Sequence, residues 1–114
     1  MSLGSKQELF SSLVPGLINE AISLGYGVRI GEVYRAPEQA RLMAERGLGI
    51  ANSNHTRKLA IDLFLSIDGR VTWDLQDYQK LGDYWKAQHE LCRWGGDFRT
   101  RDGVHFSLEH NGVA

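Results

Sequence analysis

One short apolar segment constrains the fold of this chain most, because it carries a charge inside the pattern of a buried strand. In LAIDLFL, residues 59–65, the two-residue period of a strand gives one face of four aliphatic side chains: Leu59, Ile61, Leu63 and Leu65. Asp62 then lies on the opposite face, between Ala60 and Phe64. An unpaired carboxylate there would cost several kcal/mol or take up a proton, so Asp62 needs a cationic partner, backbone donors or a metal. A structural salt bridge or a solvated sheet face is the commoner explanation for a lone aspartate of this kind.

Two histidines are placed where they could share a metal ion with Asp62. His55 lies in the polar loop that precedes the strand. In VHFSL the strand period gives an inward face of three apolar side chains: Val104, Phe106 and Leu108. His105 and Ser107 take the opposite face, so His55, Asp62 and His105 converge if the two strands are neighbours. Two imidazoles and one carboxylate are a typical ligand set for catalytic zinc, although the spacing alone arises often by chance.

Asp102 lies three residues before His105, in the turn DGVH. A catalytic zinc site needs a carboxylate that is not a ligand, which takes a proton from water and passes it to the leaving amine. Without the histidine, an ordinary Asp-Gly turn would be the preferred interpretation. Asp102 is therefore the candidate general base.

The remaining segments predict helices and short strands. Apolar residues at helical spacing predict a helix from Lys6 to Leu24, ended by Gly25 and either kinked at Pro15 or divided there into two helices. Further elements are predicted as a strand from residue 26 towards residue 34, a helix at 37–46 closed by Gly47, a strand at 59–65, a turn at 68–69 leading into 70–73, a helix at 74–91 and a strand at 104–108. Because helices and strands do not alternate regularly, we expect an α+β fold with packed helices and a small, largely antiparallel sheet.

Length and hydrophobic content predict one domain. The 114 residues, 42% of them hydrophobic, suffice for a single core, so we expect one domain over residues 1–114. Residues 1–5 are consistent with a partial expression scar. The single cysteine, Cys92, excludes an internal disulfide and is expected to be a small buried apolar residue.

Charge and hydropathy restrict the partners. Thirteen basic and fourteen acidic residues give a net charge of -1, and the short clusters TRK and RTR form no basic face, so we expect no nucleic-acid binding. The chain shows no signal-peptide pattern and no apolar run of the roughly 20 residues that span a bilayer, which predicts synthesis in the cytoplasm and no membrane insertion. The oligomeric state is left open.

Taken together, these residues resemble the zinc peptidases of bacterial peptidoglycan, namely D-alanyl-D-alanine carboxypeptidases and dipeptidases and phage L-alanyl-D-glutamate endolysin peptidases. Ser53, His55, Ala60 and Asp62 match the motif S-x-H-x-x-x-x-A-x-D, and Asp102 and His105 match D-x-x-H. The blocks VYRAPEQ, DYQKLGDYW, WGGDF and DGVHFSLEHNG resemble small phage or prophage members, from about Tyr34 to the C-terminus.

The resemblance implies roles for individual residues. One zinc ion would be bound by His55, Asp62 and His105, and Asp102 would be the general base. Arg35 matches an arginine that the family uses near the scissile carbonyl or the substrate carboxylate. Judged from its neighbours alone, Arg35 would be a surface residue paired with Glu32 or Glu38. Ser53 would help to hold the metal site.

Several further residues around this set also bear on the site. Trp94, Gly95 and Gly96 form either a wall for the substrate or a core tryptophan followed by a turn, and both interpretations stay open. His89 and His110 are expected to be surface residues rather than ligands.

Lys58 stands where many family members have glycine, which could change the loop or the substrate groove. The base is aspartate where many carboxypeptidases have glutamate, which favours the endolysin branch.

The resemblance also implies a fold and a function. The family fold, shared with the signalling domain of Hedgehog proteins, is α+β with the metal on one face of a small antiparallel sheet. The implied activity is hydrolysis of stem or cross-link peptides of peptidoglycan, by a phage or prophage lysis enzyme that would reach the cell wall after release through a holin-type pore. The alternative is a non-catalytic zinc-containing module of the same fold that binds the cell wall.

Overall fold

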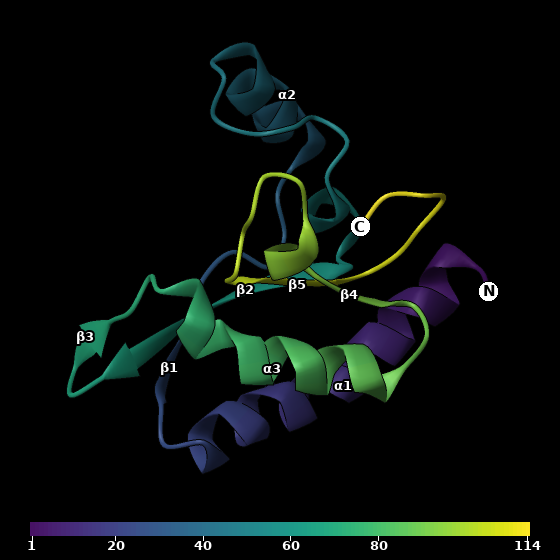
Figure 1. Cartoon of the computed structure of the whole chain (residues 1–114). Coiled ribbons are helices and arrows are strands. Elements are labelled where there is room, and N and C mark those ends of the chain that lie inside the picture. Colours follow the sequence, from purple (N-terminus) through teal and green to yellow (C-terminus); the bar gives the residue numbers. More distant parts are fainter.

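Helices on both sides of a small sheet make up the structure, a computed structural model that describes residues 1–114 (Figure 1). The helices are α1 (Leu3–Ser23), α2 (Pro37–Glu45) and α3 (Leu75–Gln88), with two 3-10 turns, η1 (Asn54–Arg57) and η2 (Gly95–Asp97). The strands are β1 (Gly27–Ile30), β2 (Ala60–Ile67), β3 (Arg70–Val71), β4 (Cys92–Trp94) and β5 (His105–Leu108). The predicted α+β class is confirmed.

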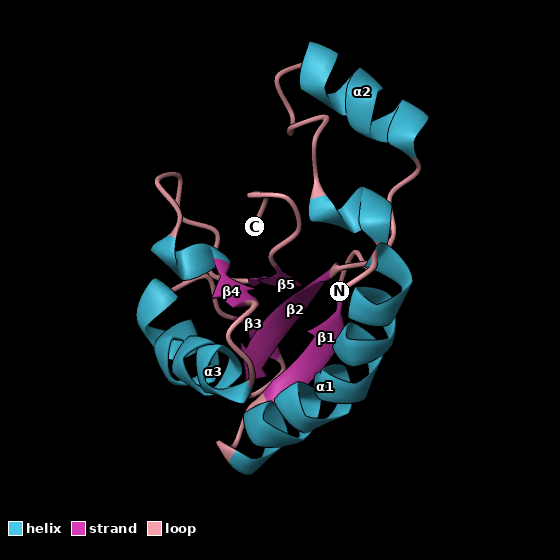
Figure 2. Ribbon diagram, turned by 90° about the vertical axis from the view of Figure 1, so that its right-hand side faces the viewer, coloured by secondary structure: helices cyan, strands magenta, loops and turns pink.

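The sheet is antiparallel throughout, in the order β1-β2-β5-β4, with the short β3 also paired to β2. One face of β2 packs against α1 and α3, as Figure 2 shows. Ile61, Leu63 and Leu65 on this face and Leu59 just before the strand are almost fully buried, as the strand period predicts. The core also includes Phe10 from α1 and Trp85 from α3, whose rings meet edge to face. The opposite face of β2 and β5 is left for polar side chains.

Helix α1 is a single helix that runs through Pro15, so the prediction of two helices is wrong. Pro15 is exposed, and so is Ser11, whose carbonyl loses its usual partner and can bind water instead. The helix begins earlier than predicted, because Ser2 accepts a hydrogen bond from the Ser5 amide and caps it. Residues 3–5 are therefore part of α1. The predicted left-handed cap is present at Gly25, with a φ of 95°.

Two boundaries near the C-terminal half also differ from the prediction. Helix α3 ends at Gln88, and His89 is already extended, so Leu91 does not belong to the helix. Strand β4 was not predicted, because three residues are too few to show a strand period. Strand β2 continues to Ile67, and the predicted turn follows it, with positive φ angles at Asp68 and Gly69.

Helix α2 projects from the body on the side of the sheet opposite α1 and α3 (Figures 1 and 2). Ala40 is its only buried residue. The loops on both sides of α2 return to the sheet near the polar face of β2, where they contribute Arg35, Leu48 and Ile50 to a cleft described below. None of the helices is both long enough and apolar enough to cross a bilayer.

Candidate metal centre

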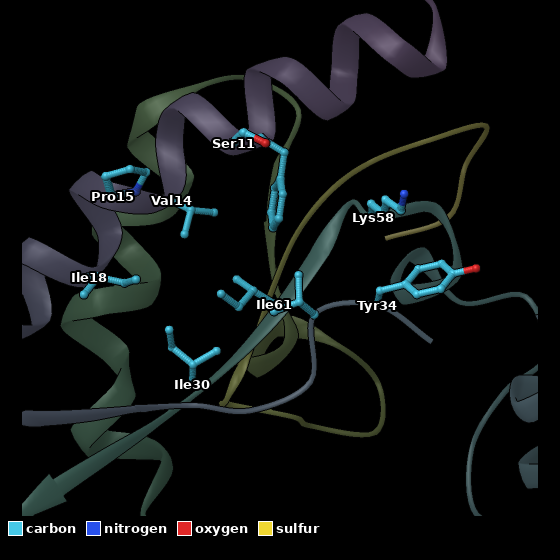
Figure 3. A pocket seen from close by; sticks show the side chains of 10 residues that line it. Ser11, Val14, Pro15, Ile18, Ile30, Tyr34, Lys58 and Ile61 are labelled. Atoms are coloured by element: carbon cyan, nitrogen blue, oxygen red, sulfur yellow. The ribbon is translucent and has the colours of Figure 1, made fainter. Parts of the chain in front are cut away.

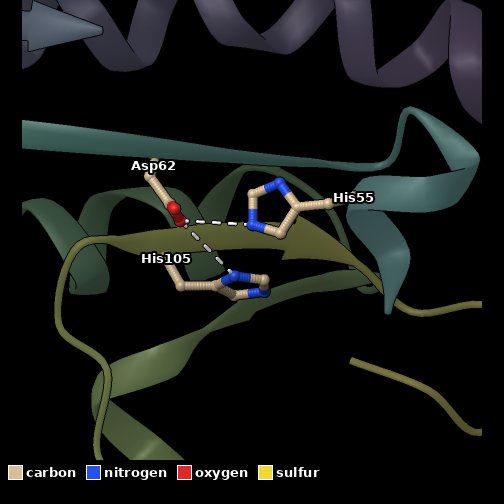
Figure 4. A group of neighbouring side chains, drawn as sticks. All are labelled: His55, Asp62 and His105. Carbon is tan, nitrogen blue, oxygen red and sulfur yellow. Dashed lines mark ion pairs between the residues drawn. The ribbon is translucent and has the colours of Figure 1, made fainter. Parts of the chain in front are cut away.

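The pairing of β2 with β5 sets Asp62 directly opposite His105. The 3-10 turn η1 brings His55 to the same place, and Figure 4 shows the three side chains pointing toward one another. Nε2 of His55 lies 3.3 Å from Oδ1 of Asp62, and Nδ1 of His105 lies 3.7 Å from the same oxygen. The structure thus brings together the three residues that the sequence analysis selected as ligands.

Several contacts fix the orientation of His55. Ser53 caps η1 by accepting a hydrogen bond from the His55 amide at 3.2 Å, and both residues are buried. On the far side of the ring, Nδ1 lies 3.2 Å from the carbonyl oxygen of Val33. A donor at Nδ1 leaves the lone pair of Nε2 directed at Asp62, which is the arrangement that orients metal-binding histidines in other proteins. Ser53 therefore braces the loop that carries His55.

The electrostatics of the group are those of a carboxylate held between two imidazoles. Burial alone raises the pKa of Asp62, but His105 and His55 outweigh it and hold the pKa at about 2. Burial lowers the pKa of His55, whereas Asp62 raises it, and the net effect is a pKa above its ordinary value. At neutral pH Asp62 is consequently ionised.

The group also has unused ligand atoms. Oδ1 of Asp62 and Nε2 of His105 are buried without a hydrogen-bond partner, which is costly unless something else satisfies them. One ligand atom from each of the three residues can be chosen so that all lie within 4.8 Å of one another. Tetrahedral zinc with ligands at about 2.0–2.2 Å separates them by roughly 3.3–3.6 Å. The donor set and its spacing therefore fit a metal of the zinc type.

A cleft of about 490 Å³ opens over this group and is called the metal cleft below. His55, Asp62 and His105 line it, together with Ser53, Arg35 and Asp102. Asp102 is exposed to solvent at the lining of the cleft, where surrounding atoms partly bury its carboxyl group. This burial raises the pKa of Asp102, and the charge of Asp62 adds to the rise, against the opposing effect of His105 and His55. A raised pKa suits a group that must both accept and return a proton near neutral pH.

The WGGDF segment lies beside Asp102. Trp94 is 1% exposed and packs in the core, and neither it nor Gly95 or Gly96 lines the metal cleft, which favours a core tryptophan followed by a turn among the two interpretations. The Asp102 amide donates a hydrogen bond to the Gly95 carbonyl at 2.8 Å. A Cβ atom on Gly95 would lie 2.1 Å from the Asp102 carbonyl oxygen, so only glycine allows this close approach.

Arg35 has the ion pair that its neighbours suggested and also lies at the metal cleft. It lines the metal cleft, and it also forms an ion pair with Glu32, while its Nε is buried without a partner. Glu32 approaches His55 as well, with Oε1 3.7 Å from Nδ1. Glu32 thus connects a candidate ligand to Arg35, a link that the sequence analysis missed. The glutamate lies three residues before Arg35, but no local pattern reveals that His55 folds back onto both.

A comparison with known protein families identifies the family of this chain. The family model described as D-alanyl-D-alanine carboxypeptidase, a family of peptidases, matches residues 46–108, which is more than half of the 114 residues. The chain belongs to this family. The matched region of this carboxypeptidase-family chain contains all three candidate ligands and also Asp102.

Other comparisons bear on the fold. The crystal structure of the L-Ala D-Glu endopeptidase ChiX of Serratia marcescens superposes with a TM-score of 0.67 at 24% sequence identity, over 82% of this chain and 75% of the other. No curated protein sequence matches closely enough to be counted as a relative. The carboxypeptidase-family chain therefore shares its fold with an enzyme of known structure.

The departure from the family motif at Lys58 has a conformational explanation. Lys58 ends η1 in the left-handed region, with a φ of 58° and a ψ of 36°, where glycine carries no steric penalty. Its ammonium lies 5.4 Å from the centre of the Tyr34 ring (Figure 3), at one end of an apolar pocket of about 470 Å³ under α1. Lys58 accordingly adopts a backbone conformation that glycine would take without penalty, and it adds a cation–π contact.

Replacing Lys58 with glycine is expected to raise the free energy of unfolding by up to about 1 kcal/mol, because relief of the left-handed strain exceeds the entropy lost to a more flexible unfolded chain. Urea denaturation measures this change. Lys58→Ala is the matched control, since it removes the contact with Tyr34 but keeps a Cβ atom in the strained region. Equal stability of the two variants would contradict the conformational explanation.

Proposed function

We propose that this chain is a zinc-dependent peptidase that hydrolyses stem or cross-link peptides of bacterial peptidoglycan. The observation that supports it best is the register of β2 and β5, which sets Asp62 against His105 beneath a cleft that also contains Asp102. His55, Asp62 and His105 would hold one zinc ion, and Ser53 would support them through the His55 amide.

Two residues of the metal cleft, Asp102 and Arg35, have a step in the proposed reaction. Bound zinc would supply a Lewis acid that lowers the pKa of water towards about 7 and polarises the peptide carbonyl. Asp102 accepts the proton of the attacking water and returns it to the departing amine. The guanidinium of Arg35 donates hydrogen bonds to the carbonyl oxygen or to a carboxylate of the substrate, and loss of one such donor commonly costs about 3–4 kcal/mol.

Two bonds are candidates for cleavage. We infer the L-Ala-D-Glu bond as the first candidate, because Asp102 replaces the glutamate typical of carboxypeptidases and because the similar solved structure is that of an L-Ala D-Glu endopeptidase. The description of the matching family favours the terminal D-Ala-D-Ala bond as the second. The resemblance to small phage and prophage members further supports a role in lysis of the bacterial cell.

A non-catalytic module that binds zinc and the cell wall is the less favoured function. Structural zinc is usually held by four protein ligands, whereas three groups meet here. A binding module has no need of Asp102, a carboxylate with a raised pKa in the same cleft.

Removal of the metal tests the proposal. Dialysis against a chelator should abolish the release of fragments from purified peptidoglycan, and one equivalent of zinc should restore it. The metal-free protein should also unfold at a lower temperature, because zinc that binds only the folded chain stabilises it. Mass spectrometry of the fragments from defined stem peptides identifies the bond.

Two outcomes would contradict the proposal. Undiminished cleavage by protein shown to contain no metal would exclude a metallopeptidase mechanism. Stoichiometric zinc without cleavage of peptidoglycan or of either candidate bond would instead favour the binding module.

A further inference from the structure

A second hollow of about 310 Å³ lies beside the metal cleft and is called the side hollow below. Its lining includes Trp73, Leu75, Val104, Arg101 and Asp102. The last two also line the metal cleft, so the two hollows meet along the turn that carries the candidate base.

Trp73 gives the side hollow an exposed aromatic surface. It is 71% exposed, whereas the other two tryptophans, Trp85 and Trp94, are at most 1% exposed. Its ring lies 5.5 Å from that of Phe64, at an interplanar angle of 64°. Phe64 is two residues beyond Asp62 in β2, so the aromatic pair continues the face of the sheet that carries the candidate metal ligands.

The segment around Trp73 is anchored on both sides. The amide of Thr72 donates to the Leu65 carbonyl at 2.9 Å, and the Thr72 carbonyl accepts from the Tyr78 hydroxyl at 2.8 Å. On the other side, Asp74 caps α3 by accepting from the Gln76 amide at 3.0 Å. The exposed ring is thus presented by fixed backbone, which lowers the entropy cost of binding a ligand against it.

Arg101 supplies a charge without a partner. It is exposed, and its guanidinium forms neither an ion pair nor a hydrogen bond within the chain. A guanidinium at the junction of two hollows is suited to a carboxylate, which it can bind through two parallel hydrogen bonds. The apolar side chains of Trp73, Leu75 and Val104 beside it suit a short aliphatic group.

We propose that the side hollow binds a residue of the peptide substrate away from the cleaved bond, with its aliphatic part on Trp73 and a free carboxylate on Arg101. This inference rests on the proposed function and names a determinant of its specificity. Arg101 and Asp102 line both hollows, which argues for the same substrate molecule, and the charge of Arg101 argues for its acidic peptide part. A stem peptide carries free carboxylates that take no part in the cleaved bond, and these are the groups available to Arg101.

Paired substrates test the proposal. One stem peptide with L-Ala-D-Glu at its start and D-Ala-D-Ala at its end is prepared with its carboxylates free or converted singly to amides. Arg101→Gln should raise KM for the free acid about tenfold and leave kcat within about threefold, since charge-assisted contacts remote from the reacting bond act mainly on binding. With the wild type, one of the singly amidated peptides should show the same rise in KM. With Arg101→Gln, that peptide should show no further rise in KM.

Trp73 is tested in the same assay. Trp73→Ala should also raise KM, and Trp73→Phe should recover most of the loss because it keeps an aromatic face. Arg99→Gln is the matched control, because Arg99 is also exposed but lines neither hollow. Thermal unfolding of every variant shows that the changes in KM do not reflect loss of the fold.

A readout that is independent of catalysis separates this inference from the proposed function. Titration calorimetry of the free-acid peptide with metal-free protein should give weaker binding for Arg101→Gln than for the wild type. If the wild type cleaves the peptide but the Arg101 and Trp73 variants match it in KM and in binding, the side hollow is not a subsite. If Trp73→Ala affects only substrates that carry the glycan, the occupant is a sugar and the proposal is wrong. A wild type that cleaves no stem peptide contradicts the proposed function itself.

Discussion

Replacing His105 with alanine is expected to abolish zinc binding and peptidase activity together. His105 faces Asp62 across β2 and β5, and its removal leaves one imidazole and one carboxylate, too few for a stable zinc site. Substitutions of groups that only orient metal ligands already cost 10–100-fold, so we expect a loss of activity of at least about a hundredfold. Metal analysis of the purified protein and fragment release from peptidoglycan measure both effects.

His89→Gln is the control for His105→Ala. His89 follows α3 and accepts a hydrogen bond from the Leu91 amide, away from the metal cleft. The His89→Gln protein should keep one zinc per chain and wild-type activity. Full zinc content in His105→Ala, or loss of zinc in His89→Gln, would show that the ligands have been assigned incorrectly.

The second large effect is expected for Asp102→Asn, which should reduce kcat by about 10²–10⁴-fold while zinc binding remains. Asparagine preserves the shape of the side chain, and the hydrogen bond from the Asp102 amide to Gly95 does not depend on the carboxylate. The variant therefore separates proton transfer from positioning. Steady-state kinetics on a defined stem peptide, with metal analysis of the same sample, provides the measurement.

Asp68→Asn makes the same chemical change outside the cleft. Asp68 lies in the exposed turn after β2 with a φ of 51°, a conformation that asparagine tolerates well. It should leave kcat unchanged. An Asp102→Asn protein that is fully active with zinc bound would mean that another group transfers the proton.

Local sequence patterns predicted the strands that carry the candidate ligands. The alternation in residues 59–65 correctly separated the buried aliphatic face from Asp62, because burial on one side of a strand fixes the direction of every side chain. The turn at Asp68 and Gly69 was also predicted, since each residue type there favours positive φ. Membership of the carboxypeptidase family, expected from the motifs, is confirmed.

Features that depend on contacts between distant segments could not be predicted in this way. The burial of Trp94 results from packing against α3, where a Cβ atom on Gly82 would lie 2.2 Å from the indole ring. The approach of Glu32 to His55 depends on how the loop after β1 meets η1. Neither contact leaves a periodic signal, and the same holds for the meeting of Trp73 with the turn at Arg101.

The pairing of Asp62 with His105 has a consequence for how the chain assembles. Side chains alternate along a strand, so a slip of one residue between β2 and β5 would move His105 to the aliphatic side and Phe106 to the polar side. Only one alignment of these two strands can create the cluster, and any ion captured there would select that alignment from the others. A sheet with any other alignment would lack the cluster and could not bind the ion, so metal binding would stabilise only the correctly paired strands.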